Sequence, residues 1–359
     1  MCNLSEEISK AENALKLYTL DGDVKSVLPY GSGHINTTFK VVTAFNAEYI
    51  LQKINDKLFD VPKLMDNILK VTEYAKVHSK TVTLPTLVLS DGGKSYVKTE
   101  DGFYRVYDFV KNSVSFQVAS SEELCYLTAA TFAEFSRILK DFPAETLYEI
   151  IPKFHDTTDR FSQLENAVKE DKCGRAKNVK KEIEFAFNRK NYCGVITEAI
   201  KAGKIPLRVT HNDTKLNNLL FTPDGKTALA VIDLDTVMPG SALFDFGDMC
   251  RFGCNSALED ETDLNKVYFK KDFFKSFAKG YMSILGRELT EAEKLNLPFS
   301  AILMTFECGM RFLTDYLSGD TYFKISRENH NLDRCRTQFK LVADMEREIE
   351  ELNVFVKSL

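Results

Sequence analysis

The feature that most constrains the fold is a predicted hairpin that follows the polar stretch HNDTKLNN at residues 211–218. Two apolar runs, 219–221 and 228–232, flank the segment Pro223-Asp224-Gly225-Lys226. Pro and Asp followed by Gly are typical of a tight turn between two strands. The chain is therefore expected to fold back on itself here and to return its second strand alongside the polar stretch.

The register of this hairpin decides which polar side chains meet. If Thr222 pairs with Thr227, residue 218 lies opposite residue 231. Asn218 then lies near Asp233, although 15 positions separate the two residues in the sequence.

The hairpin and the loop before it thus gather Asp213, Asn218 and Asp233 at one edge. An amide oxygen beside a carboxylate suits a hard cation such as Mg²⁺, which takes few protein ligands and leaves room for phosphate oxygens. Asp213 would be free to hydrogen-bond a substrate hydroxyl, although an Asp in a turn or at a helix cap is the structural alternative. Phosphoryl transfer requires such a combination of a metal site and a base.

Size and charge exclude several classes of protein. The 359 residues favour two domains, and a formal net charge of −5 without a basic stripe argues against a nucleic-acid partner. No apolar run is long enough to span a membrane, and the N-terminus lacks a signal-peptide core. The eight scattered cysteines are typical of reduced thiols. We therefore expect a cytoplasmic protein. A monomer is expected as well, although these features leave the oligomeric state open.

The predicted elements change in character near residue 110. A small β-sheet domain with one main helix precedes this point, built from a helix at 5–20, two strands within 26–44, a strand at 47–55, a helix at 61–78 and short strands up to about 110. Helical periodicity dominates afterwards, beginning with 120–142, except around 205–236. The predicted domains are therefore residues 1–110 and 111–359.

The polar residues of the hairpin region also carry a family resemblance. Asp213 and Asn218 have the spacing of the protein-kinase catalytic loop, and Asp233 takes the position of the metal-binding DFG aspartate. The form H-x-D…N followed by I-D-L-D resembles the aminoglycoside phosphotransferase and choline kinase group. More narrowly, five stretches resemble the N-acetylhexosamine 1-kinases: 30–39, 105–110, 207–220, 232–253 and 306–323.

This resemblance implies an α+β, two-lobed, protein-kinase-like fold with a small antiparallel N-terminal sheet and a larger helical lobe. It also implies that ATP and Mg²⁺ bind between the lobes and that a phosphoryl group passes to the anomeric hydroxyl of N-acetylglucosamine or N-acetylgalactosamine. Asp213 would be the base, and Asn218 and Asp233 would be the metal ligands.

The nucleotide site implied by the resemblance consists of Gly31, Ser32, Gly33, Gln52, Asp108, Phe109 and Val110. The turn at 30–34 would cover the phosphates, although a tight turn without a ligand fits its residues equally well. The segment 108–110 would take the adenine edge with its backbone, or be an ordinary strand end. Gln52 takes the position of the usual phosphate-binding Lys and Lys53 follows it, so that only one of the two can face the phosphates.

The sugar site implied by the resemblance consists of His34, Asp213, Phe252, Arg311 and Tyr322. Phe252 would stack on the sugar, or else belong to the core. From spacing alone, Glu307, Arg311 and Asp315 fall on one helix face and favour an exposed ladder of ion pairs. The resemblance instead assigns Arg311 and Tyr322 to the hydroxyls and the acetamide.

Several neighbouring residues receive supporting roles. His211 would hold the loop by hydrogen bonds, and Asp245 would brace it from behind through backbone N–H groups. Asp235 would bind a second ion or orient the loop, and His155 has no assigned role.

Three other functions remain compatible with these residues. One is a kinase of the same fold that acts on an aminoglycoside, choline, homoserine or methylthioribose. The others are a nucleotide-binding scaffold without catalysis, to which Gln52 lends support, and a metal-dependent hydrolase.

Overall fold

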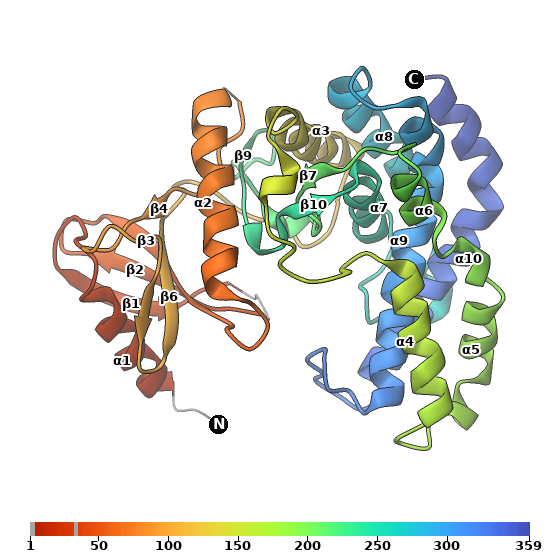
Figure 1. Ribbon diagram of the computed structural model, residues 1–359, viewed down its shortest axis with the longest axis horizontal. Coiled ribbons are helices and arrows are strands. Elements are labelled where there is room, and N and C mark those ends of the chain that lie inside the picture. The colour runs from red at the N-terminus through yellow and green to blue at the C-terminus, as the bar shows by residue number, and fades with distance from the viewer. Residues whose placement is uncertain (1–3, 32–34, 80) are drawn as a thin grey trace.

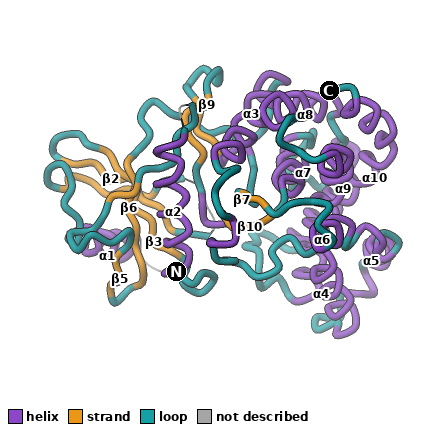
Figure 2. The backbone as a smooth tube through the Cα atoms, turned by 45° about the horizontal axis from the view of Figure 1, so that its top comes forward, coloured by secondary structure: helices purple, strands orange, loops and turns teal. Residues whose placement is uncertain are grey.

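A six-stranded antiparallel sheet forms the N-terminal end of the protein, and helices form most of the remainder (Figures 1 and 2). The computed structural model describes residues 4–31, 35–79 and 81–359. The strands run in the order β1-β2-β3-β6-β4, and β5 also pairs with β6. Their bounds are Val24–Pro29 (β1), Thr37–Thr43 (β2), Glu48–Ile54 (β3), Leu87–Val88 (β4), Val97–Thr99 (β5) and Gly102–Asp108 (β6).

The two faces of this sheet pack against different partners because side chains alternate along each strand. Phe39, Val41 and Leu51 form a small core with helix α1, Leu4–Leu15. The opposite face looks toward helix α2 and the C-terminal part. The sheet ends at Asp108, two residues before the predicted boundary at 110.

Helix α2 spans Val61–His78, as its periodicity predicts, and begins after the capping carboxylate of Asp60. Its buried side chains belong to the large core of the C-terminal part rather than to the core beneath α1. Asn67 fastens α2 further, because its amide donates to the carbonyls of Tyr148 and Val237 over 2.8 and 3.1 Å. The helix therefore joins the sheet to the rest of the protein (Figure 1).

The C-terminal part is built around the long helix α9. Gly247 of α7 lies so close to α9 that a Cβ there would stand 2.3 Å from the carbonyl oxygen of Ser300. The helices are α3 (Glu122–Ile138), α4 (Thr157–Glu170), α5 (Lys180–Phe187), α6 (Val195–Lys201), α7 (Ala242–Gly253), α8 (Lys271–Leu285), α9 (Glu291–Ser318) and α10 (His330–Lys357). The predicted α+β class, with an antiparallel sheet and a larger helical region, is confirmed. Within the described ranges, no helix has the length and apolar character needed to cross a membrane.

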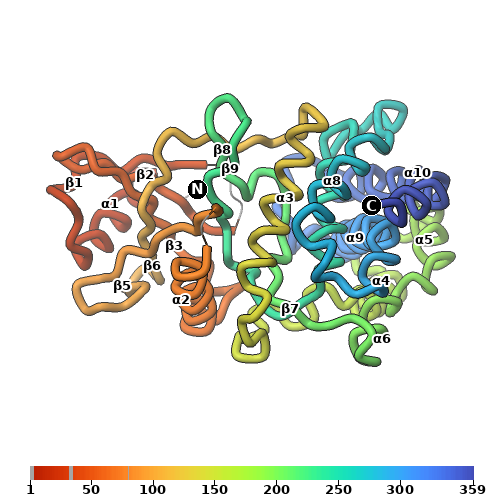
Figure 3. Tube along the Cα trace, turned by 90° about the horizontal axis from the view of Figure 1, so that it is seen from above, coloured from red at the N-terminus to blue at the C-terminus, as the bar shows by residue number. Residues whose placement is uncertain are grey.

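The predicted hairpin is present and lies between the sheet and the helices of the C-terminal part (Figure 3). Its strands are β8 (Leu219–Phe221) and β9 (Ala228–Val231), and the N–H of Thr222 donates to the carbonyl of Thr227 as expected. A second short pair is formed by β7 (Arg208–Thr210) and β10 (Met238–Gly240), which lie on either side of the hairpin in the sequence.

The register of the hairpin differs from the prediction by one position. A shift occurs in the pairing of β8 and β9, where the carbonyl of Leu229 instead accepts from the N–H and the hydroxyl of Thr83. Asn218 consequently pairs with Ile232 rather than residue 231. The N–H of Ile232 donates to the carbonyl of Asn218 over 2.9 Å. The shift brings Asn218 one residue closer to Asp233 than the simple register does.

Candidate active site

The polar loop between β7 and β8 is held from behind by Asp245, near the start of α7. The N–H groups of His211 and Asn212 donate to the two oxygens of this carboxylate over 3.0 and 2.7 Å. The hydroxyl of Thr214 donates to the carbonyl of Asp245 over 2.5 Å. Burial raises the pKa of Asp245 to about 6, while His211 and the two N–H groups oppose that rise. The bracing contact expected of Asp245 is therefore present.

Two further side chains fix the loop in place. The Nε2 atom of His211 lies 2.9 Å from the carbonyl of Ile232, and the imidazole packs edge-on against Phe132 and Phe135. Asn212 adopts a left-handed conformation with φ of 62°, and its amide donates to the carbonyl of Thr236 over 2.9 Å. His211 thus holds the loop by hydrogen bonds, as expected.

Asp213 lies at the open side of this loop between two donors. The amide of Asn218 donates to one carboxylate oxygen over 2.9 Å, and the ammonium group of Lys215 lies 3.2 Å from the other. Burial alone would raise the pKa of Asp213, but Lys215 and His211 hold it below its usual value. Because its pKa is lowered, the carboxylate is ionised. Its side chain remains 25% exposed and is therefore open to a ligand.

Asp233 follows β9 in a left-handed conformation with φ of 60° and opens the 3₁₀ turn Leu234–Thr236. The side chain is open to solvent, yet the protein around it withdraws enough water to raise its pKa to about 7, and Asp235 and Asp213 add to the effect. Such a concentration of carboxylates favours the presence of a cation.

The residues present fit a magnesium ion. The amide nitrogen of Asn218 faces Asp213, so its amide oxygen faces away from that residue and is available as a ligand. The carboxylate of Asp233 lies one residue beyond the Asn218–Ile232 pair. Within the described ranges, no group of three or more His, Cys, Asp or Glu side chains could hold a metal by itself. A site with two protein ligands, completed by phosphate and water, agrees with the coordination that Mg²⁺ prefers.

The sheet supplies the other wall of the site. Tyr30 contacts Phe109 with ring centroids 5.8 Å apart, which brings the start of the turn at Gly31 beside the segment after β6. The N–H groups of Asp108 and Phe109 already donate to carbonyls of the sheet region, over 3.0 and 3.1 Å. Any adenine contact of this segment would therefore use its carbonyls or Val110. Ser32, Gly33 and His34 lie outside the described residues.

Gln52 and Lys53 point to opposite faces of β3. Lys53 lies on the α1 face, where its ammonium group is 3.8 Å from Glu7. Gln52 lies on the face toward the C-terminal part, and its amide bonds Arg105 and Thr38. Gln52 therefore takes the inward position, but its polar atoms bond neighbouring side chains.

On α9, the exposed ladder favoured by spacing is absent, because Glu307 and Asp315 are both buried. Glu307 lies 2.9 Å from Nδ1 of His155 and accepts from the hydroxyl of Thr157 over 2.7 Å. Nε2 of His155 lies 3.2 Å from the carbonyl of Asn212, in the polar loop between β7 and β8. Helix α9 is thereby joined to this loop through His155, a contact that spacing within α9 could not indicate.

Asp315 organises the segment after α9 and brings Arg311 and Tyr322 together. Its carboxylate accepts from the N–H groups of residues 321–323 over 2.8–2.9 Å. The guanidinium of Arg311 then lies 3.4 Å from the hydroxyl of Tyr322, beside the rings of Phe154 and Phe323. Both predicted sugar-binding residues thus lie in one group, one helical turn from Glu307.

Phe252, at the end of α7, lines a separate small cavity of about 40 Å³ with Leu258 and Gln338. The neighbouring Arg251 is buried, and its guanidinium lies 2.7 Å from Glu259. Gln338 is buried as well, and its amide oxygen has no hydrogen-bond partner among the described residues. Phe252 is half-buried and packs against the large core, with this small cavity beside it.

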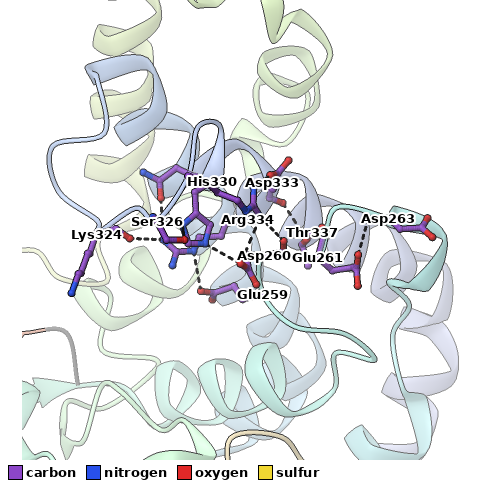
Figure 4. Close-up of polar contacts among 12 residues, drawn as sticks. Glu259, Asp260, Glu261, Asp263, Lys324, Ser326, His330, Asp333, Arg334 and Thr337 are labelled. Carbon is purple, nitrogen blue, oxygen red and sulfur yellow. Dashed lines mark hydrogen bonds and ion pairs between the residues drawn. The ribbon is translucent and has the colours of Figure 1, made fainter. Parts of the chain in front are cut away.

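Figure 4 shows the polar contacts between α10 and the segment that contains Glu259, which lines this cavity. Nε2 of His330 lies 3.0 Å from Asp260, and the hydroxyl of Thr337 donates to the carbonyl of Glu261 over 3.2 Å. These contacts hold the segment around Leu258 in place beside Phe252.

Comparison with known proteins shows which family the chain belongs to. The sequence profile of the phosphotransferase enzyme family matches residues 26–268, which is more than half of the chain. A solved aminoglycoside phosphotransferase from Alicyclobacillus acidocaldarius superposes with a TM-score of 0.68 at 12% identity, over 97% of this chain and 96% of that one.

Two further solved structures have the same fold. A microcompartment-associated aminopropanol kinase superposes with a TM-score of 0.60 at 17% identity, over 96% of this chain and 98% of that one. An aminoglycoside phosphotransferase with ADP bound superposes with a TM-score of 0.56 at 14% identity, over 95% of this chain and 99% of that one. At these identities the likeness shows the fold alone.

Proposed function

Because the chain belongs to the phosphotransferase enzyme family, we propose that it transfers the γ-phosphoryl group of ATP to the anomeric hydroxyl of an N-acetylhexosamine. The products are ADP and an N-acetylhexosamine 1-phosphate. The observation that carries the proposal is the group formed by Asp213, Asn218 and Asp233. The amide of Asn218 donates to Asp213, and burial, together with the charges of Asp235 and Asp213, raises the pKa of Asp233.

Asp213 orients the acceptor hydroxyl and accepts its proton. The hydroxyl oxygen forms a bond to the γ-phosphorus, the bond from that phosphorus to the β–γ bridging oxygen breaks, and ADP leaves. Lys215 and Asn218 keep the carboxylate ionised and fixed, so that it can receive the proton as the new bond forms. Most of the rate enhancement comes from positioning and charge neutralisation, and no covalent enzyme intermediate is needed.

Asn218 and Asp233 would hold the magnesium ion, which neutralises phosphate charge when it is bound. ATP as the donor is supported by the ADP found in one neighbour of the same fold. In this proposal the nucleotide lies between the segment 108–110 and the turn at Gly31, beside the contact of Tyr30 with Phe109.

The charge of Arg311 supports this acceptor class. Its guanidinium, set among the rings of Phe154, Tyr322 and Phe323, can donate to several hydroxyl or carbonyl oxygens. A cationic amino alcohol or aminoglycoside would meet a like charge there. A neutral acceptor with many hydroxyls and an acetamide fits better.

The test is ADP release from Mg²⁺-ATP with a panel of acceptors. The panel contains N-acetylglucosamine, N-acetylgalactosamine, aminopropanol, ethanolamine, homoserine, methylthioribose and an aminoglycoside. We expect ADP release only with the two N-acetylhexosamines and a product whose phosphate is on the anomeric carbon, as located by ³¹P–¹H correlation NMR.

Other outcomes contradict the proposal in distinct ways. If an amino alcohol is phosphorylated and the sugars are not, the proposed acceptor class is wrong, but the proposal that the protein is a kinase still holds. A 6-phosphate product overturns the placement of the anomeric hydroxyl at Asp213. ADP binding without turnover on any acceptor points to a scaffold instead.

A further inference from the structure

Gln52 occupies the position at which related kinases have a phosphate-binding Lys. The side-chain amide of Gln52 is hydrogen-bonded to an arginine, Arg105. Gln52 of β3 and Arg105 of β6 are directly paired in the sheet and point to the same face. The amide oxygen of Gln52 accepts from Nε and Nη2 of Arg105 over 3.0 and 2.8 Å, while its nitrogen donates to Thr38 over 3.1 Å. Gln52 therefore fixes the plane of the Arg105 guanidinium.

The carboxylate that Arg105 faces comes from the C-terminal part of the protein. Arg105 is only 1% exposed, and its Nη1 lies 2.6 Å from Oδ1 of Asp235. On α2, the contact of Arg105 is the sulfur of Met65 at 3.8 Å. The ion pair of Arg105 thus runs between the sheet and the turn that follows Asp233.

The second oxygen of Asp235 is also held from the sheet side. The amide of Asn36 donates to Oδ2 of Asp235 over 2.6 Å, and its own oxygen accepts from the N–H of Asn55 over 3.0 Å. Asn36 lies just before β2, two residues after the turn expected to cover the phosphates. Residues of the N-terminal part therefore contact both oxygens of a carboxylate from the C-terminal part, Oδ1 through the ion pair with Arg105 and Oδ2 through the hydrogen bond from Asn36.

Such a pair has a defined energetic consequence. Two charges buried together offset each other, but removing one leaves the other buried without compensation, which is strongly destabilising. Asp235 belongs to the same short turn as Asp233, so the position of Asp233 depends on where Asp235 is held.

We propose that Arg105 and Asp235 form an anchor between the two parts, which positions Asp233 and replaces both the usual Lys–Glu pair and a second metal ligand at Asp235. Arg105 and Asp235 are then positioning residues, and neither touches the phosphates. The inference rests on the proposed function only in taking Asp233 as the metal ligand.

The test is a double-mutant cycle of Arg105→Met, Asp235→Asn and the combined variant, with two readouts. The first is the melting temperature of the metal-free protein in EDTA, and the second is the affinity for ADP with and without Mg²⁺. Neither readout needs an acceptor, so a failure of the proposed sugar reaction is separate from a failure of the anchor. Arg189→Met is the control, because Arg189 forms a partly exposed ion pair with Glu346 of α10 and contacts neither Asp235 nor Asp233 among the interactions of the described residues.

We expect Arg105→Met to lower the metal-free melting temperature by roughly 5 °C or more, and Asp235→Asn in that background to recover much of the loss. Arg105→Met should weaken Mg²⁺-dependent ADP binding on the order of tenfold, as measured for outer-shell partners of metal ligands, whereas Arg189→Met should leave it unchanged.

A simple second metal ligand behaves differently. In that case Asp235→Asn leaves the melting temperature of the metal-free protein unchanged or higher. The losses of Mg²⁺-dependent ADP affinity caused by Asp235→Asn and Arg105→Met then add fully, and the combined variant recovers none of the melting temperature lost in Arg105→Met. This set of results would overturn the anchor. Equal effects of Arg189→Met and Arg105→Met on ADP binding would overturn it as well.

Discussion

The side-chain amide of Asn218 donates to both the carboxylate and the carbonyl of Asp213, over 2.9 and 2.8 Å. Because the nitrogen of this amide is committed to Asp213, its oxygen faces away and is left for a cation. One side chain thus orients the proposed base and offers a ligand to the proposed metal ion. The two functions are tied together by the geometry of a single amide group.

This double role predicts how Asn218→Ala should behave. We expect the Mg²⁺ concentration for half-maximal ADP release to rise on the order of tenfold to a hundredfold, as for other losses around a metal site, and turnover at saturating Mg²⁺ to fall as well. Initial rates measured over a Mg²⁺ series check both effects.

The matched control is Asn217→Ala, because the amide of Asn217 points to Gln117, 3.4 Å away, rather than to Asp213. It should keep the Mg²⁺ dependence of the wild type. An Asn218→Ala protein with an unaltered Mg²⁺ requirement would contradict the metal assignment.

The buried carboxylate of Asp245 predicts a pH dependence of stability. Its pKa is raised from an ordinary value of about 4 to about 6, so the folded protein favours the protonated form. The stabilising contribution of that proton is complete below about pH 4 and is lost as the pH rises through about 6. Relative to Asp245→Asn, the wild type should therefore lose on the order of 1 kcal/mol of unfolding free energy between about pH 5 and about pH 8.

Urea denaturation of both proteins at the two pH values measures this difference. The Asn side chain also disrupts one N–H contact, but that cost is the same at both pH values. A constant difference in stability across the range would mean that Asp245 is ionised throughout.

Much of the fold was predictable because it follows from local patterns. Apolar β-forming residues on either side of a turn predicted the first two strands, and alternation predicted the third. The proline and the apolar spacing predicted α2 at its observed bounds. The hairpin pairing was off by one because Leu229 bonds Thr83, a partner from a distant segment that leaves no mark in the hairpin itself. Local sequence predicts strands, whereas long-range contacts set their exact register.

For the candidate site as well, local sequence predicted some contacts, whereas others depend on long-range packing. The spacing within 211–233 was sufficient to bring Asp213 and Asn218 together. Nothing local indicated that Arg105 would face Asp235, or that Glu307 would be buried against His155. Charges spaced by four on a helix fit an exposed face and a buried network equally well, and only tertiary packing separates the two.

Arg311 provides a prediction about the acceptor. Arg311→Ala should raise the KM for the N-acetylhexosamine on the order of tenfold or more, because a charged donor to sugar oxygens is lost. ADP affinity should stay within a factor of about two, since among the described residues no contact joins Arg311 to the proposed nucleotide side. Steady-state kinetics with either substrate varied, together with ADP titration, measures the two effects.

Arg287→Ala, an exposed arginine after α8, is the control and should alter neither value. Equal losses for sugar and nucleotide in Arg311→Ala would place the acceptor elsewhere.

The most direct test of the account is turnover of Asp213→Asn at saturating Mg²⁺-ATP and acceptor, measured alongside its ADP affinity. The substitution keeps the shape of the side chain but removes the group that receives the proton. We predict that turnover falls on the order of 10²–10⁴-fold, as for other general bases, while ADP binding and the melting temperature stay close to those of the wild type. Near-normal ADP release by Asp213→Asn would contradict the central claim.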